Sequence, residues 1–191
     1  MKPVFLVLSL LPLAAGQDRV DPSFSIKDVQ GRLQRPFDAQ AKAASIVFFI
    51  TNDCPISNRY AREIQRTCSD YGDRARCFLD YVDPDLTATE VLKHMSEFGY
   101  AGISAILDTR QAVVKASGAT VTPETAVIAA GGKLAYRGRI DNTYLTFGQA
   151  RRQPTERDLR LALDAVLQGK PVAAARTKPI GCYIPPLDLK K

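Results

Sequence analysis

Three absences narrow the possible functions of this 191-residue chain. After residue 15, no segment is long and apolar enough to be a membrane-spanning helix. The lysines and arginines, which leave a net charge of +6, form no run interleaved with aromatic residues, so the pattern does not favour nucleic-acid binding. No Cys-x-x-Cys motif is present either, because the fourth position counted from Cys54 is Ser57. The question is then what Cys54 does without a neighbouring cysteine.

Residues 1–16 have the pattern of a secretory signal peptide. Lys2 supplies a positive charge, residues 4–15 are apolar, and Ala-Ala-Gly at the end offers the small residues that a signal peptidase needs. We therefore expect a secreted or periplasmic protein; an uncleaved anchor or a buried N-terminal element is the weaker alternative. Residues 17–169 are expected to form one domain, and residues 170–191, with four prolines, an extended C-terminal tail.

Hydrophobic spacing predicts strands that alternate with helices. Buried strands are expected at residues 45–50, 75–82 and 103–108. Helices are expected at residues 57–71, 87–99, 109–117 and 155–167, with Thr109 and Thr155 as N-caps. A hairpin is expected between residues 126–129 and 133–140, and a polar loop at residues 141–154. This order predicts an α/β fold around a mixed sheet.

Two motifs resemble the thioredoxin-like superfamily. A strand, SIVFFI, ends at Cys-Pro where a helix starts, and VTPETAVI precedes the hairpin GGKLAYRGRID. The resemblance covers residues 24–169 and is strongest to the extracytoplasmic redoxins, the branch with alkyl-hydroperoxide-reductase-like and cytochrome-maturation thioredoxins. It implies a thioredoxin-like fold, with a central mixed β-sheet flanked by helices and a helix–strand insertion at residues 87–108.

The resemblance also implies roles for the residues around Cys54. Pro123 is expected to be cis and to lie against the cysteine, and Pro55, Thr122 and Pro123 are expected to bind the substrate. The implied reaction is thiol–disulfide exchange with the thiols or disulfides of partner proteins, without a bound cofactor. The sequence carries no indication of the oligomeric state.

The chemistry of Cys54 supports a redox role independently. A cysteine at a helix N-terminus meets the positive end of the helix dipole and unpaired N–H groups, which favour the thiolate. The thiolate is the nucleophile in disulfide exchange. Asp53 opposes this effect, because a neighbouring carboxylate disfavours a second negative charge. A purely structural Cys54 is the alternative.

The chain has four cysteines, and an oxidising compartment would favour their pairing in disulfides. Geometry limits which of the other three can pair with Cys54. Cys68 lies fourteen residues further along one predicted helix, roughly 21 Å away, whereas a disulfide needs Cα atoms within about 7 Å. Cys77 starts the second strand, at the opposite edge of a parallel pair. A structural Cys68–Cys77 disulfide is therefore predicted, and Cys182 becomes the candidate resolving cysteine. An exposed or intermolecular Cys182 remains the alternative.

Peroxide reduction is a second hypothesis. Thr51, three residues before Cys54, completes a Thr-x-x-Cys pattern that resembles the peroxiredoxin signature, which makes Thr51 a candidate catalytic residue. That signature also contains a proline where this chain has Val47. It further requires an arginine at the start of the strand after Pro123, and none is present there.

A third hypothesis is a non-catalytic module for copper delivery. Cys54, Cys182 and His94 are of suitable ligand types, but their spacing does not indicate a site, and we predict no metal centre. A lone histidine on a helix is more often found on the surface than bound to a metal.

Overall fold

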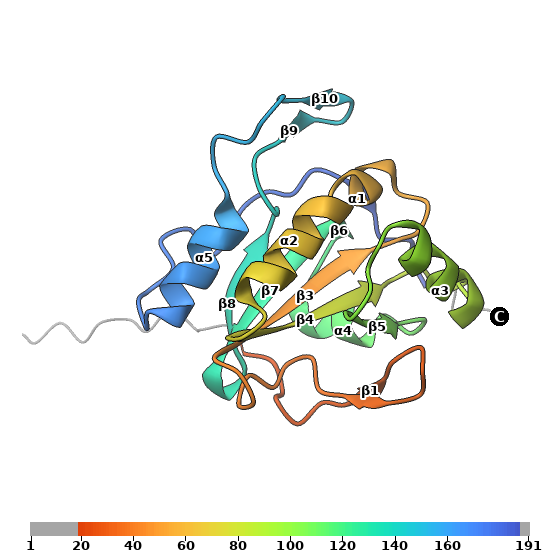
Figure 1. Cartoon of the computed structure of the whole chain (residues 1–191), viewed down its shortest axis with the longest axis horizontal. Coiled ribbons are helices and arrows are strands. Elements are labelled where there is room, and N and C mark those ends of the chain that lie inside the picture. Colours follow the sequence, from red (N-terminus) through yellow and green to blue (C-terminus); the bar gives the residue numbers. More distant parts are fainter. Residues whose placement is uncertain (1–18, 188–191) are drawn as a thin grey trace, which may run out of the picture.

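The fold is built on a five-stranded mixed sheet. The structure, a computed structural model, describes residues 19–187, and Figure 1 shows the sheet at its centre. The strand order is β5-β4-β3-β7-β8. The strands are β3 (Ala44–Ile50), β4 (Ala75–Tyr81), β5 (Ser104–Leu107), β7 (Glu124–Ala129) and β8 (Lys133–Gly138). A short 3-10 turn, Ala130–Gly132, joins the last two.

Strand β3 is central because its sequence suits burial on both faces. All seven of its residues, ASIVFFI, are buried. It runs parallel to β4 and antiparallel to β7, and β4 runs parallel to β5. The three parallel strands therefore end at one edge of the sheet, and the Cys-Pro motif follows the end of β3 at that edge.

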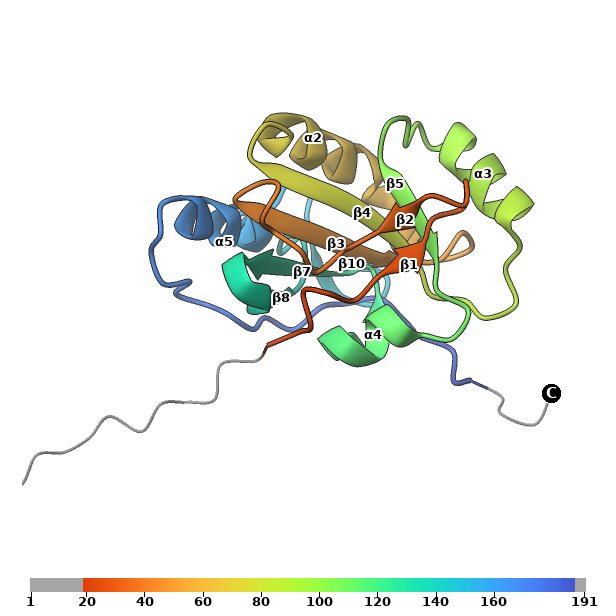
Figure 2. The same ribbon diagram turned by 90° about the horizontal axis from the view of Figure 1, so that it is seen from below.

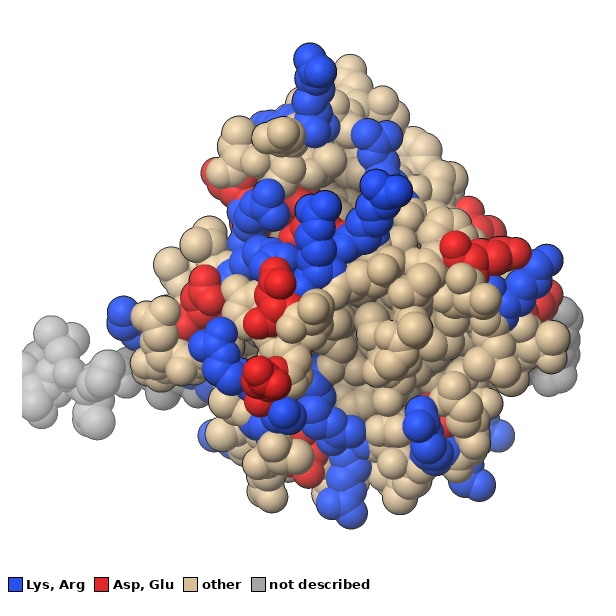
Figure 3. Space-filling view, viewed as in Figure 1, with Lys and Arg blue, Asp and Glu red and all other residues tan. Residues whose placement is uncertain are grey.

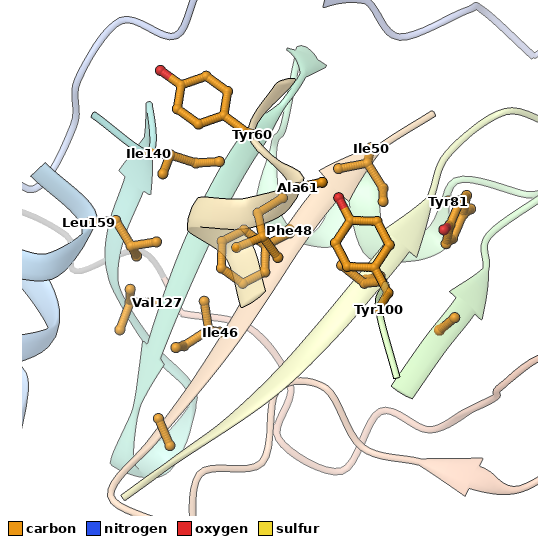
Figure 4. Packing of buried hydrophobic residues seen from close by; sticks show 14 of the residues in the cluster. Ile46, Phe48, Ile50, Tyr60, Ala61, Tyr81, Tyr100, Val127, Ile140 and Leu159 are labelled. Atoms are coloured by element: carbon orange, nitrogen blue, oxygen red, sulfur yellow. The ribbon is translucent and has the colours of Figure 1, made fainter. Parts of the chain in front are cut away.

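Helices cover both faces of the sheet, as Figure 2 shows. Ile46, Phe48 and Ile50 of β3 pack into one hydrophobic cluster with Ile56, which follows Cys54, and with residues of three longer helices (Figure 4). These helices are α2 (Ala61–Tyr71), α3 (Ala88–Glu97) and α5 (Asp158–Leu167). Val47 and Phe49 point to the other face, where they join a second cluster with residues of α4 (Ala112–Ser117). The alternation along β3 thus links the two halves of the core.

Residues 55–71 form two helices, so the prediction of one continuous helix is wrong. Helix α1 (Pro55–Arg59) ends at Tyr60, and α2 begins at the next residue. The hydroxyl of Tyr60 donates to Oδ1 of Asp141 at 2.6 Å. This contact with a distant segment anchors the side chain at the break, and no local pattern could have indicated it.

Both predicted helix N-caps are also wrong: another side chain caps α4, and α5 begins further along the chain than expected. At the start of α4, the carboxylate of Asp108, not Thr109, accepts three backbone N–H groups at 2.7, 2.8 and 3.3 Å. Helix α5 begins at Asp158, three residues later than expected. Thr155 instead accepts a hydrogen bond from the side-chain amide of Asn142 at 2.8 Å.

The segment predicted as a polar loop contains a small hairpin. Its strands are β9 (Tyr144–Thr146) and β10 (Gln149–Ala150), and Figure 1 shows the hairpin projecting above α1 and α2. Hydrophobic alternation is too short here to have indicated strands.

The C-terminal tail returns to the active-site edge of the sheet. Its strand β11 (Cys182–Tyr183) pairs antiparallel with β6 (Val121–Thr122), which precedes β7. Near the N-terminus, β1 (Ile26–Lys27) pairs with β2 (Leu33–Gln34). Within residues 19–187, no helix has the length and apolar character needed to cross a membrane. The predicted signal peptide, residues 1–16, lies outside the described residues.

One buried acid stands out in the core. Asp80 of β4 is fully buried, and neither of its carboxyl oxygens has a hydrogen-bond partner among the described residues. Burial, together with the nearby Asp108, raises the pKa of Asp80 well above its usual value. The surroundings of Asp80 therefore favour the neutral acid, since an unpaired charge is costly to bury.

A disulfide joins Cys68 of α2 to Cys77 of β4. Their Cα atoms are 5.8 Å apart, within the normal range for a disulfide. The bond closes the turn between the helix and the strand, at the edge of the sheet away from Cys54.

We predict that replacing Cys68 and Cys77 together by serine will lower the free energy of unfolding by about 2.5 kcal/mol, because the loop between them is no longer closed in the unfolded chain. Urea unfolding monitored by circular dichroism measures the change. Alkylation of Cys54 should keep its wild-type rate at low urea. A loss of Cys54 reactivity in this variant would show that the disulfide does more than stabilise the fold.

Candidate active site

Cys54 lies where the end of β3 meets α1 (Figure 1). It is the N-cap of α1, and Pro55 is the first residue inside the helix, where a proline leaves no hydrogen bond unmade. Only 1% of the Cys54 surface is exposed. Cys54 is therefore enclosed by its surroundings. The helix that it caps has five residues.

The C-terminal tail encloses it. The pairing of β11 with β6 places Cys182 opposite Thr122, and Sγ of Cys182 lies 2.8 Å from Sγ of Cys54. The peptide bond between Thr122 and Pro123 is cis. Sγ of Cys54 lies 3.2 Å from the carbonyl oxygen of Thr122, to which the thiol can donate. The structure thus brings the two cysteines and the Thr-Pro segment together at one point.

Gly181 allows the tail to come this close. A side-chain carbon at residue 181 would overlap the carbonyl oxygen of Thr122 and would also crowd the nitrogen of Pro123. Only glycine fits against this backbone.

The surroundings of Cys54 favour its ionised form. Burial opposes ionisation, but interactions with the Cys182 thiol, with the backbone and hydroxyl of Ser57 and with Thr122 outweigh it, so the pKa of Cys54 is lowered. The hydroxyls of Ser57 and Thr122 are buried and have no hydrogen-bond partner within residues 19–187. Both are therefore free to donate to the thiolate. Sequence reasoning treated Ser57 only as a missing cysteine.

Cys182 is held in the opposite state. Its burial, its hydrogen bond to Cys54 and the negative charges of Cys54 and Asp53 raise the pKa of Cys182 to about 12. The sequence indicated that Asp53 would oppose ionisation of Cys54; in the structure its charge bears on Cys182. Of the two thiols, Cys54 is therefore the one that ionises first, and the thiol of Cys182 can then donate to its sulfur.

A buried hydrogen-bond chain supports the Cys54 segment. The amide of Asn58 in α1 donates to the carbonyl oxygen of Asn52 at 2.9 Å, so its Oδ1 accepts from Nε2 of His94 at 2.9 Å. Nδ1 of His94 then accepts from the hydroxyl of Tyr81 at 2.8 Å. The expectation of a surface histidine is wrong: His94 is 4% exposed and shares its helix face with Val91 and other apolar residues. That shared face was the signal available in the sequence.

Thr51 and two arginines near the end of β8 bear on the peroxidase hypothesis. Thr51 is buried directly after β3. Arg137 forms an ion pair with Glu124 at 3.2 Å, and Arg139 forms one with Asp158 at 2.8 Å. Neither arginine contacts Cys54 in the described part of the chain.

The described residues also contain no group of three or more histidine, cysteine or acidic side chains arranged to hold a metal ion. Both ring nitrogens of His94 already have hydrogen-bond partners. Burial lowers the pKa of His94, which keeps the ring neutral.

Solved structures share this fold. The chain is similar to an uncharacterized conserved protein from Geobacillus kaustophilus, with 27% identity, coverage of 90% of this chain and 93% of the other, and a TM-score of 0.77. It is equally similar to a hypothetical protein from Sinorhizobium meliloti 1021, with 28% identity, coverage of 90% and 94%, and a TM-score of 0.76. No family model matches the chain, and no curated protein matches it at a significant level.

Similarity to proteins with described functions is more distant. A secreted Mycobacterium tuberculosis disulfide oxidoreductase, homologous to E. coli DsbE, has 12% identity, coverage of 78% of this chain and 97% of the other, and a TM-score of 0.54. M. tuberculosis DsbF has 14% identity, coverage of 76% of this chain and 96% of the other, and a TM-score of 0.55. These likenesses, together with that to a thioredoxin-like protein from Aeropyrum pernix with a TM-score of 0.55, confirm the predicted thioredoxin-like fold.

We predict that Ser57→Ala will raise the pKa of Cys54 by roughly one unit, because the thiolate loses a hydroxyl donor. The ultraviolet absorbance of the thiolate, recorded against pH in the reduced protein, measures the change. Since the thiolate forms above the pKa, the absorbance step should move to higher pH. Ser69→Ala, at an exposed serine of α2, is the matched control and should leave the step in place. An unshifted titration in Ser57→Ala would show that the hydroxyl does not bind the thiolate.

Proposed function

We propose that the protein is an exported thiol–disulfide oxidoreductase in which Cys54 is the attacking thiolate and Cys182 is the resolving cysteine. The observation that carries the proposal is the 2.8 Å separation of their sulfur atoms. Because a disulfide joins sulfur atoms about 2.05 Å apart, the two cysteines need little movement to bond. The pattern of residues 1–16 supports export, and the names of the DsbE homologue and DsbF support the reaction class.

The difference between the two thiols sets the order of events. The Cys54 thiolate attacks one sulfur of a substrate disulfide, forms a mixed disulfide and releases the other substrate sulfur as a thiolate. Once Cys54 is part of the mixed disulfide it carries no charge, so its contribution to the raised pKa of Cys182 is lost and that pKa falls. The released thiolate can take this proton. Cys182 then attacks Sγ of Cys54, frees the second substrate sulfur and leaves a Cys54–Cys182 disulfide, which a dithiol of a partner protein reduces.

The tail has to open for the first step. Cys54 is 1% exposed beneath Cys182. Strand β11 also occupies the edge of β6 at Thr122, a residue that the resemblance implies for substrate binding. Opening has to break the two-residue ladder and the bonds that flank it, from Ile184 N–H to the Thr120 carbonyl at 3.2 Å and from the Gln111 amide to the Pro185 carbonyl at 2.6 Å. Pro55, Thr122 and Pro123 would then line the exposed site, and Thr51 would support it from beneath.

We predict that Cys54→Ser will abolish the reduction of insulin disulfides, whereas Cys182→Ser will still form the mixed disulfide but release it at least about a hundredfold more slowly, because the resolving thiolate is missing. Turbidity measures turnover, and non-reducing mass spectrometry detects the trapped species. The paired replacement of Cys68 and Cys77 by serine, as the control, should turn over normally.

Other results would support the remaining hypotheses. An inactive wild-type protein that binds one equivalent of Cu(I) would favour copper delivery. Consumption of hydrogen peroxide that depends on Cys54 but not on Cys182 would favour a peroxidase.

We also predict that Gly181→Ala will make Cys54 at least about fivefold more reactive towards iodoacetamide, because the added carbon overlaps the Thr122 carbonyl and displaces the tail. Alkylation followed by peptide mass spectrometry measures the rate at fixed pH. Gly148→Ala, at an open position in the β9–β10 turn, is the control. If alkylation of Cys54 is equally slow in Gly181→Ala, the tail is not what covers the thiolate.

A further inference from the structure

An arginine-rich groove lies beside the Cys54 helix. It has a volume of about 550 Å³ between α1, α2 and the segment that carries the β9–β10 hairpin. Six arginines line it, against two acidic residues, Glu63 and Asp141. The arginines are Arg59, Arg62, Arg66, Arg151, Arg152 and Arg157. Figure 3 shows basic side chains gathered on this part of the surface.

The two acidic residues of the groove already have partners. The carboxylate of Glu63 lies within 2.8 Å of Arg160, 3.5 Å of Arg157 and 3.8 Å of Arg66. Asp141 accepts from the hydroxyl of Tyr60 at 2.6 Å and from the backbone of Thr143 at 2.9 Å. Glu63 is thus shared among three arginines, and even with the charge of Asp141 the six arginines of the groove outnumber its two carboxylates.

Three arginines of the groove therefore keep their charge available. Arg59, Arg62 and Arg152 are exposed and form no ion pair or side-chain hydrogen bond with residues 19–187. They come from α1, from α2 and from the segment after β10, so their guanidinium groups surround the groove. A guanidinium presents a planar fork of donors that matches a carboxylate.

The groove adjoins the site of chemistry. Arg59 ends the short helix that Cys54 caps, about 7.5 Å further along the helix axis. Tyr144, which lines the groove, packs against Tyr60 of the helix break with the ring centres 5.8 Å apart and the ring planes tilted. Burial raises the pKa of Tyr144, and the charges of both Arg59 and Cys54 act on it. A ligand in the groove would therefore lie at the far end of the helix that Cys54 caps, within reach of a chain that continues from a substrate sulfur bonded to Cys54.

We propose that this groove binds an acidic segment of the protein substrate, close in sequence to the disulfide that Cys54 attacks; the inference rests on the proposed function. Carboxylate side chains on an extended segment can reach into a recess, whereas the flat surface of an anionic membrane would contact mainly protruding residues. The arginines thereby select acidic substrates and speed their encounter with Cys54.

The test uses disulfide-linked peptides that differ only in four residues beside one cysteine. These residues are acidic, neutral (Gln and Asn) or basic, and stopped-flow fluorescence follows the second-order rate of exchange with the reduced full-length protein. We expect the acidic peptide to react about tenfold faster than the neutral one at low salt, and the advantage to shrink when salt screens the charges. The basic peptide should be the slowest.

Paired charge reversal locates the effect. Arg62→Glu with Arg152→Glu should remove the preference for the acidic peptide and leave the rate with the neutral peptide unchanged, which also shows that the variant is folded. Arg35→Glu with Lys170→Glu, at two exposed positions outside the groove, makes the same change in net charge. This control should keep the preference.

The outcomes separate the two proposals. If no peptide reacts with wild-type protein, the proposed oxidoreductase function fails. If the neutral and acidic peptides react at equal rates, or if the control pair removes the preference as well, the groove proposal fails while the function stands. Flotation of the protein with phosphatidylglycerol vesicles through Arg62 and Arg152, without any peptide preference, would assign the groove to a membrane and overturn the proposal.

Discussion

The parallel pairing of β3 with β4 is the constraint on which the rest of the molecule depends. Its register places Cys77 beside Ile46, near the start of both strands, whereas Cys54 follows the end of β3. The four cysteines are thereby divided between opposite edges of the sheet. At one edge Cys68 and Cys77 close a turn, and at the other Cys54 is left for a partner supplied by the tail. A misplaced bond between the two pairs would require the sheet to break.

The tail combines two roles at the second edge. It contributes the sulfur that can resolve a mixed disulfide, and it covers the thiolate that would start the reaction. Burial, the hydrogen bond to Cys54 and the charge of Cys54 together raise the pKa of Cys182. Under the proposed mechanism, loss of that charge in the mixed disulfide activates the second thiol only when it is needed. The C-terminal tail therefore supplies both the second thiol and the cover of the first.

The contact between Tyr60 and Asp141 links the redox site to the arginine groove. It accompanies the break between α1 and α2, so that Arg59 and Arg62 belong to different helices. The same two anchoring residues line the groove, and Asp141 leads into the β9–β10 segment that forms its opposite side. The groove that we propose for the substrate is therefore lined by the two residues of this hydrogen bond, which joins its two sides.

Local patterns in the sequence were sufficient for the alternating strands and helices, the fold class and the division of the cysteines, because burial and chain reach follow from residue type and spacing. They could not show the break at Tyr60 or the capping by Asp108, since the first depends on a partner distant in the sequence and the second on a competing side chain. The sequence by itself determined that Cys54 follows a buried strand and that the tail is long enough to return. Only the tertiary structure decided that Cys182 lies against Cys54, because that approach depends on the backbone fit of Gly181 to Thr122.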